Sequence, residues 1–258
     1  MDDVVQTDIT HRNEERMRRV WPVVAVVCTF IVLTILVTWP LITQIETSLA
    51  QNLHWSRDAY QSAYEIWWFK KALLELGESP GNLRWIYYPD GADYPLLLTY
   101  FFTYAQGIPF LFFLSPVGAY NVVFLLTFLF CGLAAYALCA YLTGNRWAGL
   151  CGGIIYAFFP GRVAHGLAGH LELFAIYTFP LYLLLLIKTA RRPKPATAAL
   201  CGLVLGASLL VQPLFIPFLL FPATAAWLFC EVLLHKQKLE RRAWLALGGA
   251  LLSGVVIA

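Results

Sequence analysis

The run VVAVVCTFIVLTILV at residues 23–37 is apolar from end to end, with no alternation of apolar and polar positions. A strand of a membrane barrel alternates over segments of about 10 residues, whereas a helix that crosses a bilayer needs about 20 mostly apolar residues. With its flanks, Trp21 to Thr43, the run meets the helical requirement. We expect an uncleaved anchor here, because the core of a signal peptide is only about 7–15 residues long.

Similar runs recur along the chain, of which 60% is hydrophobic and 13% charged. Soluble domains carry about 25% charged residues, so we expect an all-α, polytopic transmembrane helical bundle. The further candidate segments are 95–114, 117–142, 147–160, 172–188, 197–212, 214–234 and 243–258. The sequence predicts a cytoplasmic segment at 1–20 and one transmembrane domain at 21–258. Because the domain ends inside an apolar run, we expect it to be truncated there.

The basic residues predict the orientation of the bundle. Lys and Arg of short loops favour the cytoplasm, and 13 of the 18 fall on one side if 95–114 makes no net crossing. Gly107-Ile108-Pro109 interrupts that segment and Ser115-Pro116 ends it, which favours a re-entrant or interfacial hairpin. About seven crossings remain, in a cytoplasmic (plasma) membrane with the N-terminus inside. The loop at 44–94, with seven acids and four bases, then lies outside.

The large outer loop carries Asp58 at the head of the helical pattern DAYQSAYEIWWFKKALLEL. Ser56 is placed to cap this helix, and an aromatic stripe from Tyr60 to Lys71 predicts an amphipathic helix on the membrane surface. Asp58 is either an acid that stabilises the first helical turn or a catalytic carboxylate. As a catalytic group it would take a proton from an acceptor hydroxyl or bind a divalent metal.

Two more acids follow in the same loop. Asp90 belongs to the turn Tyr87-Tyr88-Pro89-Asp90-Gly91, and Asp93 comes directly after it. A Pro-Asp-Gly turn on structural grounds alone returns the chain to the bilayer. The alternative is that both carboxylates face the same site as Asp58.

A second outer loop, at 161–171, carries ionisable residues at the edge of apolar segments. They are Arg162, His165, His170 and, just beyond, Glu172. Such residues are costly near hydrocarbon and are often functional, although ordinary interfacial polarity explains them equally well. Arg162 has the geometry to hold a lipid phosphate by paired hydrogen bonds. The spacing of the histidines does not match a helical metal pair, so no metal ligands are assigned.

In this order, these residues resemble the integral-membrane GT-C glycosyltransferases, which include protein O-mannosyltransferase-like enzymes and bacterial relatives that use polyprenyl-phosphate sugars. The matching features are Asp58 with its helix, the turn Tyr88-Pro89-Asp90-Gly91 and the segment Ala119-Tyr120-Asn121. The likeness continues with Phe158-Phe159-Pro160, Gly169-His170 and Pro180-Leu181. Asp58 stands between Arg57 and Ala59, without the paired acid of many members, which leaves metal dependence open.

The resemblance implies transfer of a sugar from a polyprenyl-phosphate donor to an acceptor on the extracytoplasmic face. Asp58 would be the base, and Arg162, His165 and His170 would face the donor phosphate. Two other functions fit the composition: a transporter or flippase of lipid-linked precursors, and a non-catalytic envelope assembly protein. The acids gather in a loop and not in mid-span, which favours surface chemistry over transport.

The net charge and the cysteines bear on nucleic-acid binding, disulfide bonds and zinc sites. Its net charge of +3 gives no indication of nucleic-acid binding. All six cysteines lie in apolar segments, which argues against a disulfide framework or a zinc site.

Overall fold

A computed structural model describes residues 21–51, 58–234 and 241–257 of the chain. The described part is almost entirely helical, as expected, and its two strands form one small hairpin. The expected segment 1–20 and the proposed cap at Ser56 lie outside the described residues. All six cysteines are free thiols, in agreement with their placement in apolar segments.

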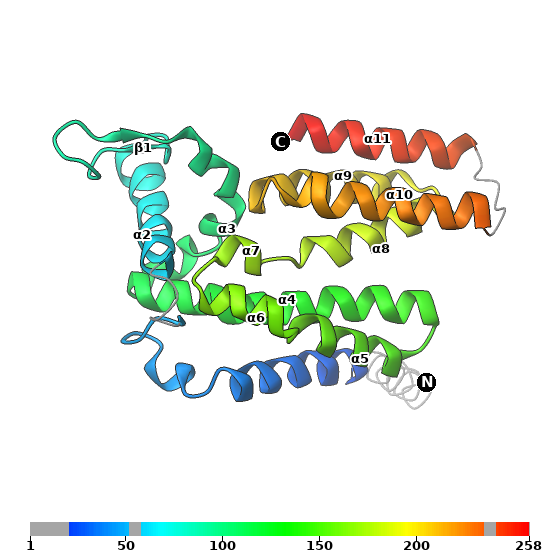
Figure 1. Ribbon diagram of the computed structural model, residues 1–258, viewed down its shortest axis with the longest axis horizontal. Coiled ribbons are helices and arrows are strands. Elements are labelled where there is room, and N and C mark those ends of the chain that lie inside the picture. Colours follow the sequence, from blue (N-terminus) through cyan, green and yellow to red (C-terminus); the bar gives the residue numbers. More distant parts are fainter. Residues whose placement is uncertain (1–20, 52–57, 235–240, 258) are drawn as a thin grey trace, which may run out of the picture.

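The larger part of the molecule is a bundle of helices aligned with its long axis (Figure 1). Its members are the N-terminal helix Trp21–Val37, α4 (Pro116–Thr143), α5 (Arg146–Ala157), α8 (Thr178–Arg191), α9 (Pro195–Val211), α10 (Phe221–Phe229) and α11 (Arg241–Ile257). Short π-helical segments, η5 (Ile216–Leu220) and η6 (Cys230–Leu234), extend α10 at both ends. Within the described residues, two helical stretches are long and apolar enough to cross a membrane, Pro116–Thr143 and Leu171–Arg191.

The longest helix, α4, has well-defined ends. Ser115 precedes it, and the Ser115 hydroxyl accepts a hydrogen bond from the Gly118 amide at 3.1 Å. The Glu46 carboxylate accepts in turn from the Ser115 amide at 3.1 Å and from the Ser115 hydroxyl. At the other end, Gly144 has φ +66°, and α5 starts two residues later with Asn145 as its N-cap. These caps fix the lengths of both helices.

Small residues allow the first helices of the bundle to pack closely. A Cβ on Gly153 would lie 2.6 Å from the Phe30 ring, and one on Gly132 would lie 2.4 Å from it. Phe30 is completely buried in this space between the N-terminal helix, α4 and α5. Such close approach through glycine is the usual way for apolar helices to associate.

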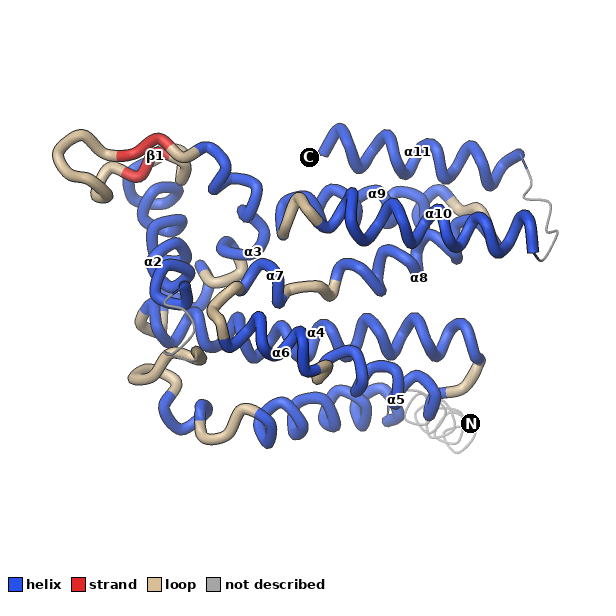
Figure 2. Tube along the Cα trace, viewed as in Figure 1, coloured by secondary structure: helices blue, strands red, loops and turns tan. Residues whose placement is uncertain are grey.

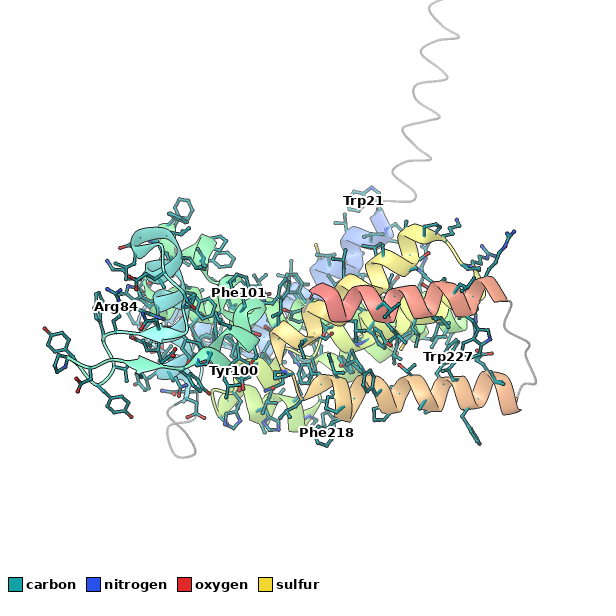
Figure 3. All side chains as sticks on the ribbon, turned by 90° about the horizontal axis from the view of Figure 1, so that it is seen from above. Trp21, Arg84, Tyr100, Phe101, Phe218 and Trp227 are labelled. Atoms are coloured by element: carbon teal, nitrogen blue, oxygen red, sulfur yellow. The ribbon has the colours of Figure 1, made fainter. Side chains whose placement is uncertain are left out.

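A second layer crosses one end of the bundle. It contains α2 (Asp58–Lys70) and the π-helical turn η2 (Lys71–Leu76), followed by the hairpin of β1 (Asn82–Leu83) and β2 (Ala92–Asp93). Figure 1 shows α2 running crosswise to the bundle, with the hairpin beyond its far end. In Figure 3, Arg84 of the hairpin lies on the outer side of this layer, and Tyr100 and Phe101 lie toward the bundle.

The aromatic stripe predicted for α2 does not form a single exposed face. Tyr60 is 56% exposed, whereas Trp68 is completely buried and its indole donates to the Pro80 carbonyl at 2.8 Å. The buried side of α2 instead includes Ala59 and Ile66. Protein therefore covers part of the aromatic stripe, and the position of α2 on a membrane surface stays a prediction.

The segment 95–114 folds into three short helices, η3 (Pro95–Tyr100), α3 (Phe101–Ala105) and η4 (Ile108–Phe112). None approaches the length of about 20 residues that a crossing requires. The break at Gly107 has a packing reason, since a Cβ there would lie 2.4 Å from the Ile66 side chain of α2. The expected interruption is therefore present, and it lets α2 sit against this segment.

Asn121 fastens the chain between the first helix and α2. Its amide nitrogen donates to the carbonyls of Ile45 and Ser48 at 2.7 and 2.8 Å, and its Oδ1 accepts from the Ala50 amide at 3.0 Å. Asn121 is fully buried in α4. The Ala-Tyr-Asn segment quoted for its resemblance thus has a structural function here.

Candidate functional site

Two short helices carry the second polar segment back to the crosswise layer. Helix α6 (Pro160–Leu167) holds Arg162 and His165, and α7 (Leu171–Phe174) holds Glu172 (Figure 2). Between them, Gly169 adopts φ +85°, a conformation that favours glycine. A Cβ at Gly169 would lie 2.2 Å from the Ala59 amide nitrogen, and the Ser62 hydroxyl donates to the Gly169 carbonyl at 3.4 Å. The turn therefore docks directly on the first turn of α2.

This contact joins Asp58 to both histidines. The Asp58 Oδ2 and His170 Nε2 atoms are 3.0 Å apart, and the Nδ1 atoms of His170 and His165 are 3.2 Å apart. The side chains of Asp58 and His170 are 49% and 34% exposed. The result is a hydrogen-bonded carboxylate–imidazole–imidazole chain that is open to solvent. We call it the Asp58–His170–His165 chain.

A more deeply buried carboxyl group lies behind this chain. Glu65 is only 4% exposed, and its Oε1 accepts from the Gln61 amide at 2.8 Å. Burial raises the pKa of Glu65, hydrogen bonds from Tyr104 and Gln61 partly oppose this, and the charges of Glu172 and Asp58 raise it further. Glu65, Glu172 and Asp58 are therefore near enough to act on one another.

Sequence reasoning missed Glu65, although a signal was present. It follows Asp58 by seven residues, which is two helical turns, and so lies on the same side of α2. Burial of a carboxyl group among the apolar and aromatic residues of YEIWWF costs free energy, so Glu65 in this stretch indicates a specific role.

Arg162 takes a different position from the one expected. It is only 3% exposed, its Nε donates to the Phe174 carbonyl at 3.0 Å, and its Nη1 donates to the Ala157 carbonyl. The guanidinium also stacks on Phe174, with Cζ 3.8 Å from the ring centroid, and lies 4.9 Å from that of Phe128. It faces protein carbonyls and aromatic rings, so it ties the end of α5 to the end of α7.

Asp90 and Asp93 are not brought together with Asp58. Both are exposed, and they belong to the hairpin beyond the far end of α2 (Figure 1). A helix of 13 residues is about 20 Å long, so the hairpin and Asp58 are separated by about the full length of α2. The structure thus joins Asp58, His165, His170 and Glu172 in one region and leaves the hairpin acids outside it.

An apolar cavity of about 310 Å³ opens next to helix α6. Most of its lining is apolar, including Val37, Leu41, Phe124, Phe128, Val163 and Leu167, and Thr38, Gln44, Ser48 and Gln51 are its polar members. Val163 and Leu167 stand two residues before and two residues after His165, about 200° around α6, so the cavity opens on the face of α6 opposite His165.

The described residues contain no group of three or more His, Cys, Asp and Glu side chains arranged to hold a metal ion. Comparisons of the chain with protein-family models, with curated proteins and with solved structures found no match.

Proposed function

We propose that this protein is a membrane glycosyltransferase that moves a sugar from a polyprenyl-phosphate donor to an acceptor on the extracytoplasmic face. The observation that carries the proposal is the Asp58–His170–His165 chain, which is exposed at one end of the bundle. It supplies a proton acceptor, which such a transfer requires.

The proposal includes a bundle with about seven crossings. Two helical stretches have the length and composition of spans, and the shorter apolar helices run alongside them (Figure 1). The basic loops at 144–146 and 191–194 both join helices at the end of the bundle opposite α2. In this orientation α2 runs along the outer membrane surface, and the site lies at the level of the lipid headgroups.

The chemistry follows from the hydrogen bonds. With the Asp58 carboxylate accepting from His170 Nε2–H, His170 Nδ1 accepts from His165 Nδ1–H, and His165 Nε2 keeps a lone pair for a substrate proton. The acceptor hydroxyl gives its proton to this chain as its oxygen bonds to the anomeric carbon. The bond between that carbon and the phosphate oxygen breaks, its electron pair leaves with the lipid phosphate, and the anomeric configuration inverts.

The donor phosphate would lie near the histidines, with its lipid tail along the bundle. The Asp58 carboxylate is also an oxygen ligand of the kind that divalent cations prefer, so a metal that binds the donor phosphate belongs to the proposal. Transfer assays with Mg²⁺, with Mn²⁺ and with EDTA test this part separately.

The decisive experiment measures sugar transfer in membranes that contain the protein. Labelled polyprenyl-phosphate sugars are supplied to wild type, Asp58→Asn, His170→Gln and His165→Gln. Removal of one acid–base group typically lowers a rate by about 10²- to 10⁴-fold, and we expect losses in this range. Glu75→Gln is the control, because Glu75 is an exposed acid on η2 that pairs with the neighbouring Lys71.

Full activity in Asp58→Asn would remove Asp58 from the mechanism. Absence of transfer with every donor, together with movement of lipid-linked sugars across the membrane, would favour a transporter. A normal envelope phenotype of all three site variants, with no transfer by wild type, would favour an assembly protein.

A further inference from the structure

Another cavity, which is polar, lies at the opposite end of the bundle from Asp58. Its volume is about 480 Å³. Its lining is made of Tyr141, Lys188, Arg191, Arg192, Lys194 and Thr197. Four of these six side chains are cationic and none is acidic, so the cavity suits an anion. We call it the basic pocket.

Three helix ends build the basic pocket. Tyr141 is in the last turn of α4, Lys188 and Arg191 are in the last turn of α8, and Lys194 precedes the first residue of α9. Cations near a helix C-terminus are favourable, which accounts for Lys188 and Arg191 on structural grounds. Arg192 and Lys194 lie beyond the end of α8 and need another reason.

Existing contacts leave the basic pocket with an excess of positive charge. Arg191 pairs with Glu231 at 3.1 Å, and the Lys188 ammonium lies 5.0 Å from the centroid of the Tyr141 ring. Arg192 and Lys194 are exposed and have no carboxylate partner among the described residues. Among the described residues, one carboxylate thus pairs with one of the four cations, and a bound anion would relieve the repulsion between the others.

The position of the basic pocket indicates where that anion comes from. Both stretches that are long and apolar enough to cross a membrane, Pro116–Thr143 and Leu171–Arg191, end at this pocket. Tyr141 is an amphipathic residue of the kind enriched where hydrocarbon meets water. The pocket therefore lies where the headgroups of the surrounding lipids are.

We propose that the basic pocket binds the phosphate of an anionic lipid headgroup, with Lys188, Arg192 and Lys194 as its principal contacts. Arginine binds phosphate through paired hydrogen bonds, and basic pockets between transmembrane helices bind anionic headgroups. The proposal rests on the membrane setting of the proposed function and not on sugar transfer. The two can fail separately, since this pocket and Asp58 lie at opposite ends of the bundle.

The test uses the whole purified protein in a neutral detergent. Dihexanoyl phosphatidylglycerol, dihexanoyl phosphatidylcholine or inorganic phosphate is titrated in, and binding is followed by native mass spectrometry and thermal shift. We expect saturable binding of phosphatidylglycerol alone. Each cation near a membrane surface contributes about fivefold in affinity, so Lys188→Gln/Arg192→Gln/Lys194→Gln should weaken binding by about a hundredfold.

Two further variants separate loss of binding from loss of folding. Arg146→Gln removes an exposed cation at the start of α5, outside the pocket, and should bind phosphatidylglycerol as wild type does. Lys188→Arg/Arg192→Lys/Lys194→Arg keeps the charges and should keep most of the affinity. Equal binding of phosphatidylcholine, full binding by the triple Gln variant, or saturation by inorganic phosphate alone would overturn the proposal.

Discussion

Replacement of Gly169 by alanine tests whether the His170 turn docks on α2 as described. The new Cβ would lie 2.2 Å from the Ala59 amide nitrogen and 2.9 Å from the Asp58 carbonyl carbon. These are backbone atoms, which cannot rotate away as a flexible side chain can. The turn must therefore move off α2, and the contact between Asp58 and His170 must lengthen.

The stability that Gly169→Ala loses has two contributions. An L residue at φ +85° is strained by about 1–2 kcal/mol, and overpacking of a tight contact adds about 1–3 kcal/mol. The sum is about 2–5 kcal/mol. Gly144→Ala is the matched control, because Gly144 has φ +66° but nothing lies within 4 Å of its Cβ position. Gly144→Ala should lose only the stability that corresponds to backbone strain. The difference in stability between the two variants therefore measures the contact of the Gly169 turn with α2.

Two measurements check this prediction. Thermal unfolding should place the melting temperature of Gly169→Ala about 2–12 °C below that of Gly144→Ala, since 1 kcal/mol corresponds to about 2–4 °C at this size. Hydrogen exchange of a peptide covering 58–66 should become faster in Gly169→Ala only. Equal melting temperatures and equal exchange in the two variants would refute the docked arrangement.

Three further predictions concern buried polar groups. Arg162→Gln should lower the free energy of unfolding by about 2–6 kcal/mol in denaturant titrations, because two carbonyl groups lose their donor at about 1–3 kcal/mol each; an unchanged value would contradict an internal role. Asn121→Ala leaves three backbone groups at 45–50 without their partner, and faster proteolysis of that segment is expected, with a loss of about 3–9 kcal/mol at the same cost for each group. Glu65→Gln tests pH dependence. Since the raised pKa means that folded Glu65 binds its proton more tightly than the unfolded chain does, its contribution to wild-type stability falls as the pH rises above about 4.3. The advantage of Glu65→Gln in melting temperature should grow over this range, and a constant difference would argue against burial of the Glu65 carboxyl group.

Local pattern was enough to predict the helical class and the interruption near Gly107. Apolar runs and breakers act within a few residues, and the structure has both where the sequence places them. Local pattern was not enough to predict which residues of the aromatic stripe on α2 are exposed. Its face depends on which segments cover it, and Trp68 is buried by a chain segment that returns more than ten residues later.

The residues of the site were identifiable by type, but their contacts were not. Asp58 and His170 stand out as polar groups beside apolar runs, yet their distance depends on a glycine turn that packs on a distant helix. The contacts of Arg162 could not be predicted from the sequence either. A cation at the start of a short helix is suited to a lipid phosphate or to protein carbonyls, and only the tertiary structure distinguishes them.

The long separation of Asp58 and His170 has a consequence for biosynthesis. His170 follows Asp58 by 112 residues, so at about 5–20 residues per second the ribosome makes the acid about 6–22 s before its imidazole partner. Asn121 is made within this interval, so residues 45–50 can be fastened first. Until the glycine turn is synthesised, the first turn of α2 lacks the segment that covers it. The order of synthesis thus keeps the acid apart from both histidines until the segment 160–174 has folded against it.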